Sequence, residues 1–196
     1  MLTSPNLSGL FTQRFLSNAL PIPPTNQFSI GSLAPPFELM DAKAKRKVRL
    51  SDYAGSRKPS EEAWNRPVLL YFTRIFTEKH YCPLCYPHIQ ALNENYEQFT
   101  QRGAEVLMFT STDERQSAQV IEHLGLKMPL LIDPSCRIFR RYQVGQALGA
   151  PLPAQFLVDP AGKIRFRHLF SFLEPNASIE RLLIALDRIK GVGVAS

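Results

Sequence analysis

The sequence contains little cysteine and no long apolar segment. Three cysteines in 196 residues, an odd number, exclude a small secreted scaffold held together by disulfides. No stretch approaches the roughly 18 apolar residues of a membrane-spanning helix, so we expect no transmembrane segment and no membrane partner. Residues 1–37 also lack acidic residues and carry a single base, Arg14, without the basic region and apolar run of a secretory signal. These absences favour a cytoplasmic protein.

The hydrophobic residues near the N-terminus are scattered. Leu7 and Phe11 have the spacing of an amphipathic segment, and Pro21 ends any helix there. We expect this segment to be an arm that packs on the main domain or on a neighbouring subunit, as in a homodimer. The expected division of the chain is an N-terminal arm at 1–28, one domain at 29–190 and a C-terminal tail at 191–196.

Basic residues outnumber acidic ones, with 23 Lys and Arg against 17 Asp and Glu, which gives a formal charge of +6. Such a balance raises the question of nucleic-acid or other anionic partners. The bases, however, lie in short clusters at 43–49 and 163–167, which are typical of a solvated turn and of one exposed strand face. We therefore expect no nucleic-acid partner.

Hydrophobic periodicity predicts alternating strands and helices. The expected strands are 37–39, 48–50, 68–72, 104–109, 130–132, 155–158 and 163–169. The expected helices are 82–102, 111–124, 134–142 and 178–189, the second of which opens with capping-box spacing between Ser111 and Glu114. The apolar run at 68–72 is typical of a strand buried on both faces. This order predicts an α/β sandwich with a mixed central sheet flanked by helices.

The motif Cys82-Pro83-Leu84-Cys85 follows the strand at 68–72 and begins the next expected helix. A cysteine at a helix N-terminus lies near the positive end of the helix dipole, which favours the thiolate. Pro83 fits the first helical position, and Cys85, one turn further on, can close a disulfide with Cys82. The spacing predicts a reversible dithiol with one nucleophilic and one resolving thiol.

Two other interpretations of this motif are half of a zinc site and a pair of inert thiols. His80 and His88 flank the motif and are of a residue type that binds zinc. A structural zinc site usually draws on a second Cys or His pair, whereas only Cys136 is left elsewhere in the chain. We therefore expect no metal and no other cofactor. We expect Cys136 to be a buried structural residue, with a second resolving role as the alternative.

The strand, the motif Tyr81-Cys82-Pro83-Leu84-Cys85, the long helix and the later segment 152–163 together resemble the thioredoxin-fold AhpC/TSA redoxins, and among them a peroxiredoxin-like group. The resemblance covers roughly residues 29–190. It implies a thioredoxin-like sandwich, and it places Pro153 at the cis-proline that faces the redox dithiol in this fold. Pro153, Tyr81 and Pro83 are thus expected to position the substrate.

The chain departs from true peroxiredoxins at two positions. Those enzymes carry a Thr three residues before the peroxidatic cysteine and an Arg near it, which position peroxide and stabilise the thiolate. Here Cys82 occupies the place of the Thr, Cys85 that of the peroxidatic cysteine, and Pro153 that of the Arg. The resemblance therefore implies a dithiol oxidoreductase with an antioxidant or disulfide-exchange role. Nearby bases that could lower a thiol pKa are Arg74, Lys79 and His80.

Three functions follow from these observations. The first is thiol–disulfide exchange, in which Cys82 attacks and Cys85 resolves. The second is peroxide reduction with Cys85 as the peroxidatic thiol and Cys82 as the resolving thiol. The third is a redox-inactive thioredoxin-fold binding module. For the enzymes, the expected partners are a protein or small-molecule thiol or disulfide, or a peroxide, with thioredoxin or glutathione as electron donor.

Overall fold

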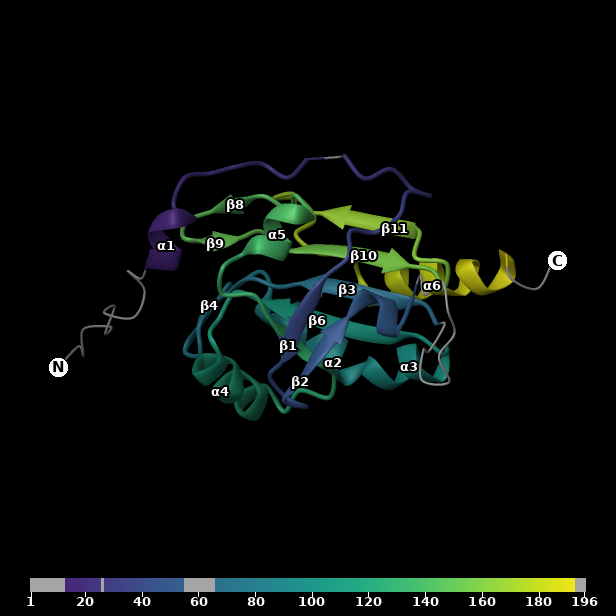
Figure 1. The fold of residues 1–196 in the computed structure, drawn as a ribbon, viewed down its shortest axis with the longest axis horizontal. Coiled ribbons are helices and arrows are strands. Elements are labelled where there is room, and N and C mark those ends of the chain that lie inside the picture. Colours follow the sequence, from purple (N-terminus) through teal and green to yellow (C-terminus); the bar gives the residue numbers. More distant parts are fainter. Residues whose placement is uncertain (1–12, 26, 55–65, 193–196) are drawn as a thin grey trace.

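A seven-stranded mixed sheet with the order β11-β10-β3-β6-β7-β1-β2 forms the centre of the protein (Figure 1). The computed structural model describes residues 13–25, 27–54 and 66–192. The strands are β1 (Glu38–Asp41), β2 (Arg46–Arg49), β3 (Val68–Phe72), β4 (Ile75–Thr77), β5 (His80–Tyr81), β6 (Glu105–Thr110), β7 (Leu130–Ile132), β8 (Gln146–Ala147), β9 (Ala150–Pro151), β10 (Ala154–Val158) and β11 (Ile164–Leu169). The helices are α1 (Gln13–Ser17), the short 3-10 helix η2 (Leu50–Asp52), α2 (Tyr86–Glu94), α3 (Tyr96–Gln101), α4 (Glu114–Leu124), α5 (Arg137–Arg141) and α6 (Ile179–Val192).

Strand β3 lies in the middle of this sheet, and all five of its side chains are fully buried. It pairs in parallel with β6 and antiparallel with β10. β6 is parallel to β7, whereas the hairpin β1–β2 joins the sheet through an antiparallel pair between β1 and β7. The predicted mixed central sheet is thus confirmed.

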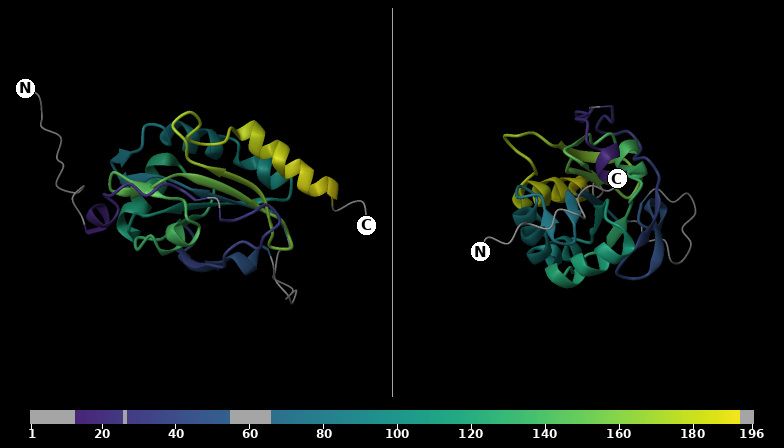
Figure 2. Two further views of the ribbon diagram at one scale, coloured as in Figure 1. Left: turned by 90° about the horizontal axis from the view of Figure 1, so that it is seen from above. Right: turned by 90° about the vertical axis from the view of Figure 1, so that its left-hand side faces the viewer.

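Successive side chains of β3 point to opposite faces of the sheet, which therefore has two hydrophobic cores. Leu69 and Tyr71 pack with side chains of α2, α3, α4 and α6. Leu70 and Phe72 pack with α5 and with the segment that carries the hairpin β1–β2. Figure 2 shows these layers, with the yellow helix α6 on one side of the sheet and the blue hairpin on the other. This arrangement is the predicted α/β sandwich.

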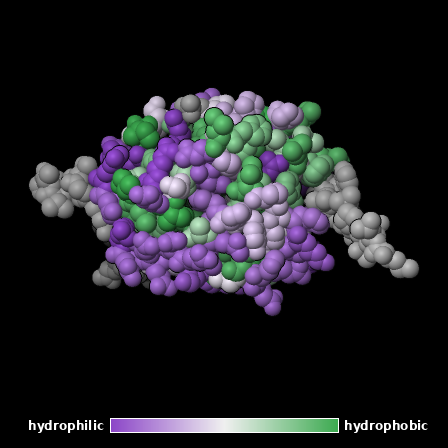
Figure 3. All heavy atoms as spheres, turned by 180° about the vertical axis from the view of Figure 1, so that it is seen from behind, coloured by the Kyte–Doolittle hydropathy of each residue, from purple (hydrophilic) through white to green (hydrophobic). Residues whose placement is uncertain are grey.

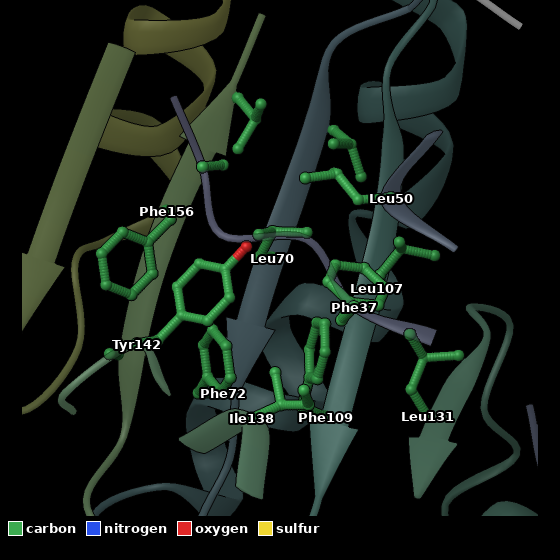
Figure 4. Close-up of a cluster of buried hydrophobic side chains, with 14 of the residues drawn as sticks. Phe37, Leu50, Leu70, Phe72, Leu107, Phe109, Leu131, Ile138, Tyr142 and Phe156 are labelled. Carbon is green, nitrogen blue, oxygen red and sulfur yellow. The ribbon is translucent and has the colours of Figure 1, made fainter. Parts of the chain in front are cut away.

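An aromatic cluster on the α5 side surrounds Phe72, the last residue of β3 (Figure 4). The ring of Phe72 stacks on Phe109 with 4.4 Å between the centroids. Phe139 and Phe156 meet the same ring edge-on at 5.2 and 5.9 Å, and Tyr142 lies tilted at 5.0 Å. These are the arrangements that aromatic rings prefer, so the cluster fixes the carboxyl end of β3.

The described residues of the predicted N-terminal arm pack against the domain. Arg14 of α1 donates hydrogen bonds to the carbonyl groups of Phe76 and Ser111, and Ile22 forms an antiparallel bridge with Gln146. Residues 1–12, with Leu7 and Phe11, and residues 193–196 of the predicted tail lie outside the described part of the chain. No helix within the described ranges is long and apolar enough to cross a membrane.

The helix after the cysteine motif begins later than predicted and is interrupted. Residues 82–85 form a turn, in which the carbonyl group of Cys82 accepts hydrogen bonds of 2.9 Å from the N–H groups of Cys85 and Tyr86. α2 therefore begins at Tyr86, with Pro87 in its first turn, where a missing N–H costs nothing. α2 ends at Glu94. The side-chain amide of the next residue, Asn95, donates to the carbonyl group of Ala91 at 2.8 Å, and α3 follows.

Two further helices begin at residues that the sequence analysis did not identify. Asp113, not Ser111, caps α4, because its carboxylate accepts a hydrogen bond of 2.8 Å from the Gln116 N–H. The carboxylate of Asp133 accepts from the Ile138 N–H at 2.7 Å and holds the intervening residues in a turn, so α5 is shorter than predicted. The strand pairs β4–β5 and β8–β9 were not predicted, because strands of two or three residues show no period.

We expect Phe72→Ala to lower the free energy of unfolding by about 3–5 kcal/mol, because it empties the centre of the aromatic cluster. Urea denaturation followed by circular dichroism measures the change. The matched control is Phe172→Ala, since the Phe172 side chain is 89% exposed and should contribute less than about 0.5 kcal/mol. Equal losses for the two variants would contradict the central position of Phe72.

Candidate functional site

The Cys82–Cys85 motif lies beyond the carboxyl end of β3. After Phe72 the chain leaves the sheet, forms the hairpin β4–β5, and returns so that the Cys82 N–H donates to the Arg74 carbonyl group at 3.3 Å. The turn of residues 82–85 and helix α2 follow directly. The hydrogen bond at the base of the hairpin thus holds the dithiol next to the central strand.

The two thiols differ in exposure and in pKa. Cys82 is 8% exposed, Cys85 is completely buried, and both are free cysteines. A hydrogen bond from the Cys85 thiol lowers the pKa of Cys82 to about 6, assisted by the backbone N–H groups of Leu84 and Cys85 and by the charge of Arg74, against the opposing effect of burial. The same hydrogen bond, together with burial, raises the pKa of Cys85. At neutral pH Cys82 is therefore the thiolate and Cys85 the thiol.

Arg74 is the cationic residue that the fold places beside this pair. Its side chain is almost completely buried, donates to the Ala147 carbonyl group at 2.6 Å, and lies over the Phe76 ring at 4.9 Å. Burial lowers the pKa of Arg74, whereas the charges of Cys82 and Cys85 raise it. The sequence analysis named Arg74 as one of three nearby bases, and its position two residues after a buried strand is a signal that could have distinguished it.

The two histidines that flank the motif have other partners. His80 Nδ1 lies 2.8 Å from the Thr77 hydroxyl group, within the hairpin β4–β5. His88 lies between the Tyr71 hydroxyl group at 3.0 Å and the Ala177 carbonyl group at 2.7 Å. Across the described ranges of the chain, no group of three or more His, Cys, Asp and Glu side chains could hold a metal ion. The sequence analysis gave no indication of the contact between Tyr71 and His88.

The remaining residues expected at the site lie around the motif. Tyr81 is partly exposed, packs on the Tyr86 ring at 5.2 Å between centroids, and its hydroxyl group lies 3.2 Å from His123 Nδ1. Burial raises the pKa of Tyr81 to about 12. Pro83 is exposed in the turn of the motif, not at the first position of the helix.

Pro153 is buried directly before β10, whose first residue, Ala154, pairs with Phe72. It therefore lies at the same end of the sheet as the dithiol. The expected cis peptide bond is not present, because the described residues contain no cis bond. The trans form is the lower-energy form of an X–Pro bond.

Cys136 is not brought to the dithiol. It precedes α5 on the face of the sheet opposite to α2, within the aromatic core, and its sulfur lies 3.7 Å from the Asn18 amide nitrogen. Burial, followed by the charge of Asp133, raises the pKa of this thiol. The location agrees with the expected structural role.

Exposed hydrophobic side chains occur in the motif itself, at Leu84, and in two segments that are linked to the motif or to Arg74 by hydrogen bonds. The Leu84 carbonyl group accepts from the Asn176 amide at 3.4 Å, so the loop before α6 adjoins the motif, and this loop carries the exposed residues Phe172 and Leu173. On another side, Leu148 is exposed next to the Ala147 carbonyl group that Arg74 contacts. Figure 3 shows hydrophobic residues along the upper part of the back face, above a hydrophilic lower part.

Solved structures with similar folds include two peroxiredoxins and a thiol-disulfide interchange protein. The reduced 2-Cys peroxiredoxin of Plasmodium vivax is 21% identical with a TM-score of 0.67, covering 85% of this chain and 84% of that one. The peroxidoxin BcpB of Mycobacterium tuberculosis is 21% identical with a TM-score of 0.67, and the match covers 83% of this chain and 99% of that one. A putative thiol:disulfide interchange protein DsbE of Chlorobium tepidum is 22% identical with a TM-score of 0.60, and the match covers 82% of this chain and 99% of that one. These similarities confirm the thioredoxin-like fold.

Sequence comparison identifies relatives and a family. The thiol-disulfide oxidoreductase ResA of Geobacillus kaustophilus is 30% identical over 138 residues, which cover 70% of this chain and 67% of the relative. The ResA of Bacillus subtilis is 26% identical over 137 residues, which cover 69% of this chain and 65% of that relative. The model of the AhpC/TSA family matches residues 30–167. The chain therefore belongs to the AhpC/TSA family.

Proposed function

We propose that this protein is a thiol–disulfide oxidoreductase in which Cys82 attacks a substrate disulfide and Cys85 resolves the mixed disulfide. The observation that carries the proposal is the asymmetry of the pair, with a thiolate at Cys82, which is 8% exposed, and a protonated thiol at Cys85, which is completely buried. A disulfide-exchanging pair needs both properties, because only a thiolate attacks and only a shielded partner resolves without being attacked first. The ResA relatives are named for this activity.

The same asymmetry argues against peroxide reduction by Cys85. A peroxidatic cysteine must be a thiolate that peroxide can reach. Cys85 is completely buried and retains its proton, because its thiol donates to Cys82. A redox-inactive binding module would not require a reactive thiol, whereas the pKa of Cys82 near 6 makes this cysteine reactive at neutral pH. We therefore favour disulfide exchange over both alternatives.

The exposed hydrophobic side chains in the motif and in the two linked segments support a protein thiol or disulfide as the substrate. Leu84, Leu148 and Phe172 offer apolar surface to the chain on either side of a protein disulfide, which a small disulfide would not need. In this proposal thioredoxin or glutathione exchanges electrons with the dithiol in the cytoplasm, and the reaction serves an antioxidant role. A homodimer is also part of the proposal.

Three neighbours are proposed to position the substrate. Pro153 directly precedes the strand paired with β3, at the end of the sheet where the dithiol lies. Pro83 lies exposed inside the motif, and Tyr81 directly before it. In their proposed roles Pro153 presents backbone to the substrate sulfur, while Pro83 and Tyr81 shape the approach to Cys82.

We expect Cys85→Ser to accumulate a mixed disulfide on Cys82 when it reacts with oxidised glutathione, because the resolving thiol is missing. Cys82→Ser should form no such adduct, since the remaining thiol is buried and protonated. Intact-mass analysis distinguishes the adduct from the free protein. The matched control is Cys136→Ser, which should behave as the wild type. An adduct that forms on Cys85 in Cys82→Ser would reverse the proposed roles.

We expect the rate at which iodoacetamide alkylates Cys82 to be half-maximal near pH 6, because the pKa of this thiol is lowered from 9.0 to about 6. The thiolate, and hence the reactivity, is present above that pH and is lost below it. Arg74→Gln should move the midpoint towards 9, because it removes a stabilising charge. The control Arg115→Gln, an exposed residue paired with Glu78, should leave the midpoint unchanged. A wild-type midpoint near 9 would contradict the assignment of Cys82 as nucleophile.

We expect the reduced protein to react with hydrogen peroxide no faster than a free thiol of the same pKa, while oxidised glutathione readily converts it to the Cys82–Cys85 disulfide. The physical reason is that Thr and Arg, which position peroxide in true peroxiredoxins, are replaced here by Cys82 and Pro153. Stopped-flow mixing followed by mass analysis gives both rates. A peroxide rate orders of magnitude above that of the free thiol would establish a peroxidase instead.

A further inference from the structure

A cavity of about 230 Å³ lies beneath the N-terminal arm, where the purple arm in Figure 1 runs past α5 and β8. Backbone hydrogen bonds tie the arm to this part of the domain. Ile22 and Gln146 exchange N–H to carbonyl hydrogen bonds of 2.8 Å in both directions. The Thr25 N–H donates to the Gln143 carbonyl group at 3.1 Å. Gly145 permits the close approach of the arm, since a Cβ atom there would lie 2.6 Å from the Ile22 carbonyl oxygen.

Apolar side chains form much of the lining of this cavity. Phe139 and Pro151 are buried beside it, and Ile22 and Pro23 line it from the arm. An apolar cavity of about 150 Å³ engineered into another protein binds one benzene molecule. A cavity of about 230 Å³ therefore has room for a somewhat larger ring system, and aromatic rings pack favourably on a phenylalanine side chain.

Asn18, a polar side chain in the lining, has an unpaired oxygen atom. Asn18 is 1% exposed, and its amide nitrogen donates to the Arg14 carbonyl group at 2.8 Å, which distinguishes the nitrogen from the oxygen. The Oδ1 atom is buried and accepts no hydrogen bond from the described residues. A buried acceptor without a donor is unfavourable, and native proteins satisfy nearly all such groups. Asn18 thus leaves a place for one hydrogen-bond donor.

Other polar side chains of the lining already have partners within the protein. The Gln146 amide nitrogen donates to the Leu20 carbonyl group at 3.2 Å. The Thr25 hydroxyl group donates to the side-chain oxygen of Gln143, whose amide nitrogen donates in turn to the side-chain oxygen of Gln27. These groups hold the arm in place, so Asn18 is the better candidate to recognise a ligand.

We propose that this cavity binds a small aromatic molecule that carries one N–H or O–H donor and no positive charge. The ring packs between Phe139 and the arm, and the donor satisfies Asn18 Oδ1. A cationic ligand is disfavoured, because Arg140 lines the cavity and the described residues of the lining include no Asp or Glu. The proposal is independent of the proposed function, since Cys136, which also lines the cavity, lies on the face of the sheet opposite to α2.

The test uses indole as the probe and indene as the matched ligand. The two molecules have nearly the same size and shape, but indene lacks the N–H group. Equilibrium dialysis of each ligand against the full chain measures the two affinities. We expect indole to bind saturably, with one molecule per chain.

We expect Asn18→Leu to lower the ratio of the indole affinity to the indene affinity by about tenfold, because a hydrogen bond to a buried acceptor is lost. The ratio is the informative quantity, since the different hydration of the two ligands affects both proteins equally. The matched control is Asn95→Leu, which should leave the ratio unchanged. The Asn95 amide also donates at 2.8 Å to a carbonyl group four residues earlier, but Asn95 does not line the cavity.

Cys136 reports where indole binds in the wild type, which keeps the test valid if Asn18→Leu loosens the arm. Iodoacetamide alkylation, followed by mass analysis of peptides, measures each cysteine separately. At about ten times its dissociation constant, indole should slow the alkylation of Cys136 by about tenfold, because only the unoccupied fraction reacts. Cys82 is the internal control and should react at an unchanged rate.

Three results would overturn the proposal, and each leaves the proposed function untouched. If indole does not bind saturably up to its limit of solubility, the cavity holds water alone. If indole protects Cys82 instead of Cys136, it binds at the dithiol and not beneath the arm. If Asn18→Leu and Asn95→Leu give the same ratio of affinities, the Asn18 oxygen does not recognise a donor.

Discussion

The hydrogen bond from the Cys85 thiol to the Cys82 sulfur determines the chemistry of this protein. It stabilises a thiolate at the more accessible cysteine and retains the proton on the buried one. Burial alone acts in the opposite direction and raises the pKa of both thiols. The backbone N–H groups of the turn and the charge of Arg74 reinforce the same polarity. One contact thus assigns two different roles to two identical side chains.

Strand β3 and the residues that follow it carry the side chains that surround the dithiol. Phe72 anchors its carboxyl end in the aromatic cluster, and Arg74 extends from there to hold the backbone of Cys82. Tyr71, on the other face of the same strand, reaches the helix that follows the dithiol. Because β3 is paired on both sides and buried on both faces, these residues have little freedom to move relative to one another. The central strand is therefore the fixed base from which the segment carrying the dithiol starts.

The sandwich, the mixed sheet and the Cys-x-x-Cys dithiol could be predicted because each leaves a local pattern in the sequence. Val68–Phe72 is an uninterrupted apolar run, and the cysteine spacing is visible by inspection. The start of α2 was misplaced because the turn at Cys82 and the helix that follows use the same kind of hydrogen bond. Arg74 and His88 were seen as residues near the motif, but their roles depend on contacts with Ala147 and Ala177, far away in the chain. Such long-range contacts leave no period or spacing that a single sequence could reveal.

The hairpin β4–β5 has a consequence for how this site can change. Its seven residues, 75–81, leave the central strand at Arg74 and return at Cys82, where one backbone hydrogen bond closes the excursion. Insertions or deletions within it would alter the surface beside the dithiol without displacing either sulfur. Selection could therefore reshape the recognition of partners here while the electron-transfer centre stays constant. The hairpin separates the evolution of specificity from that of reactivity.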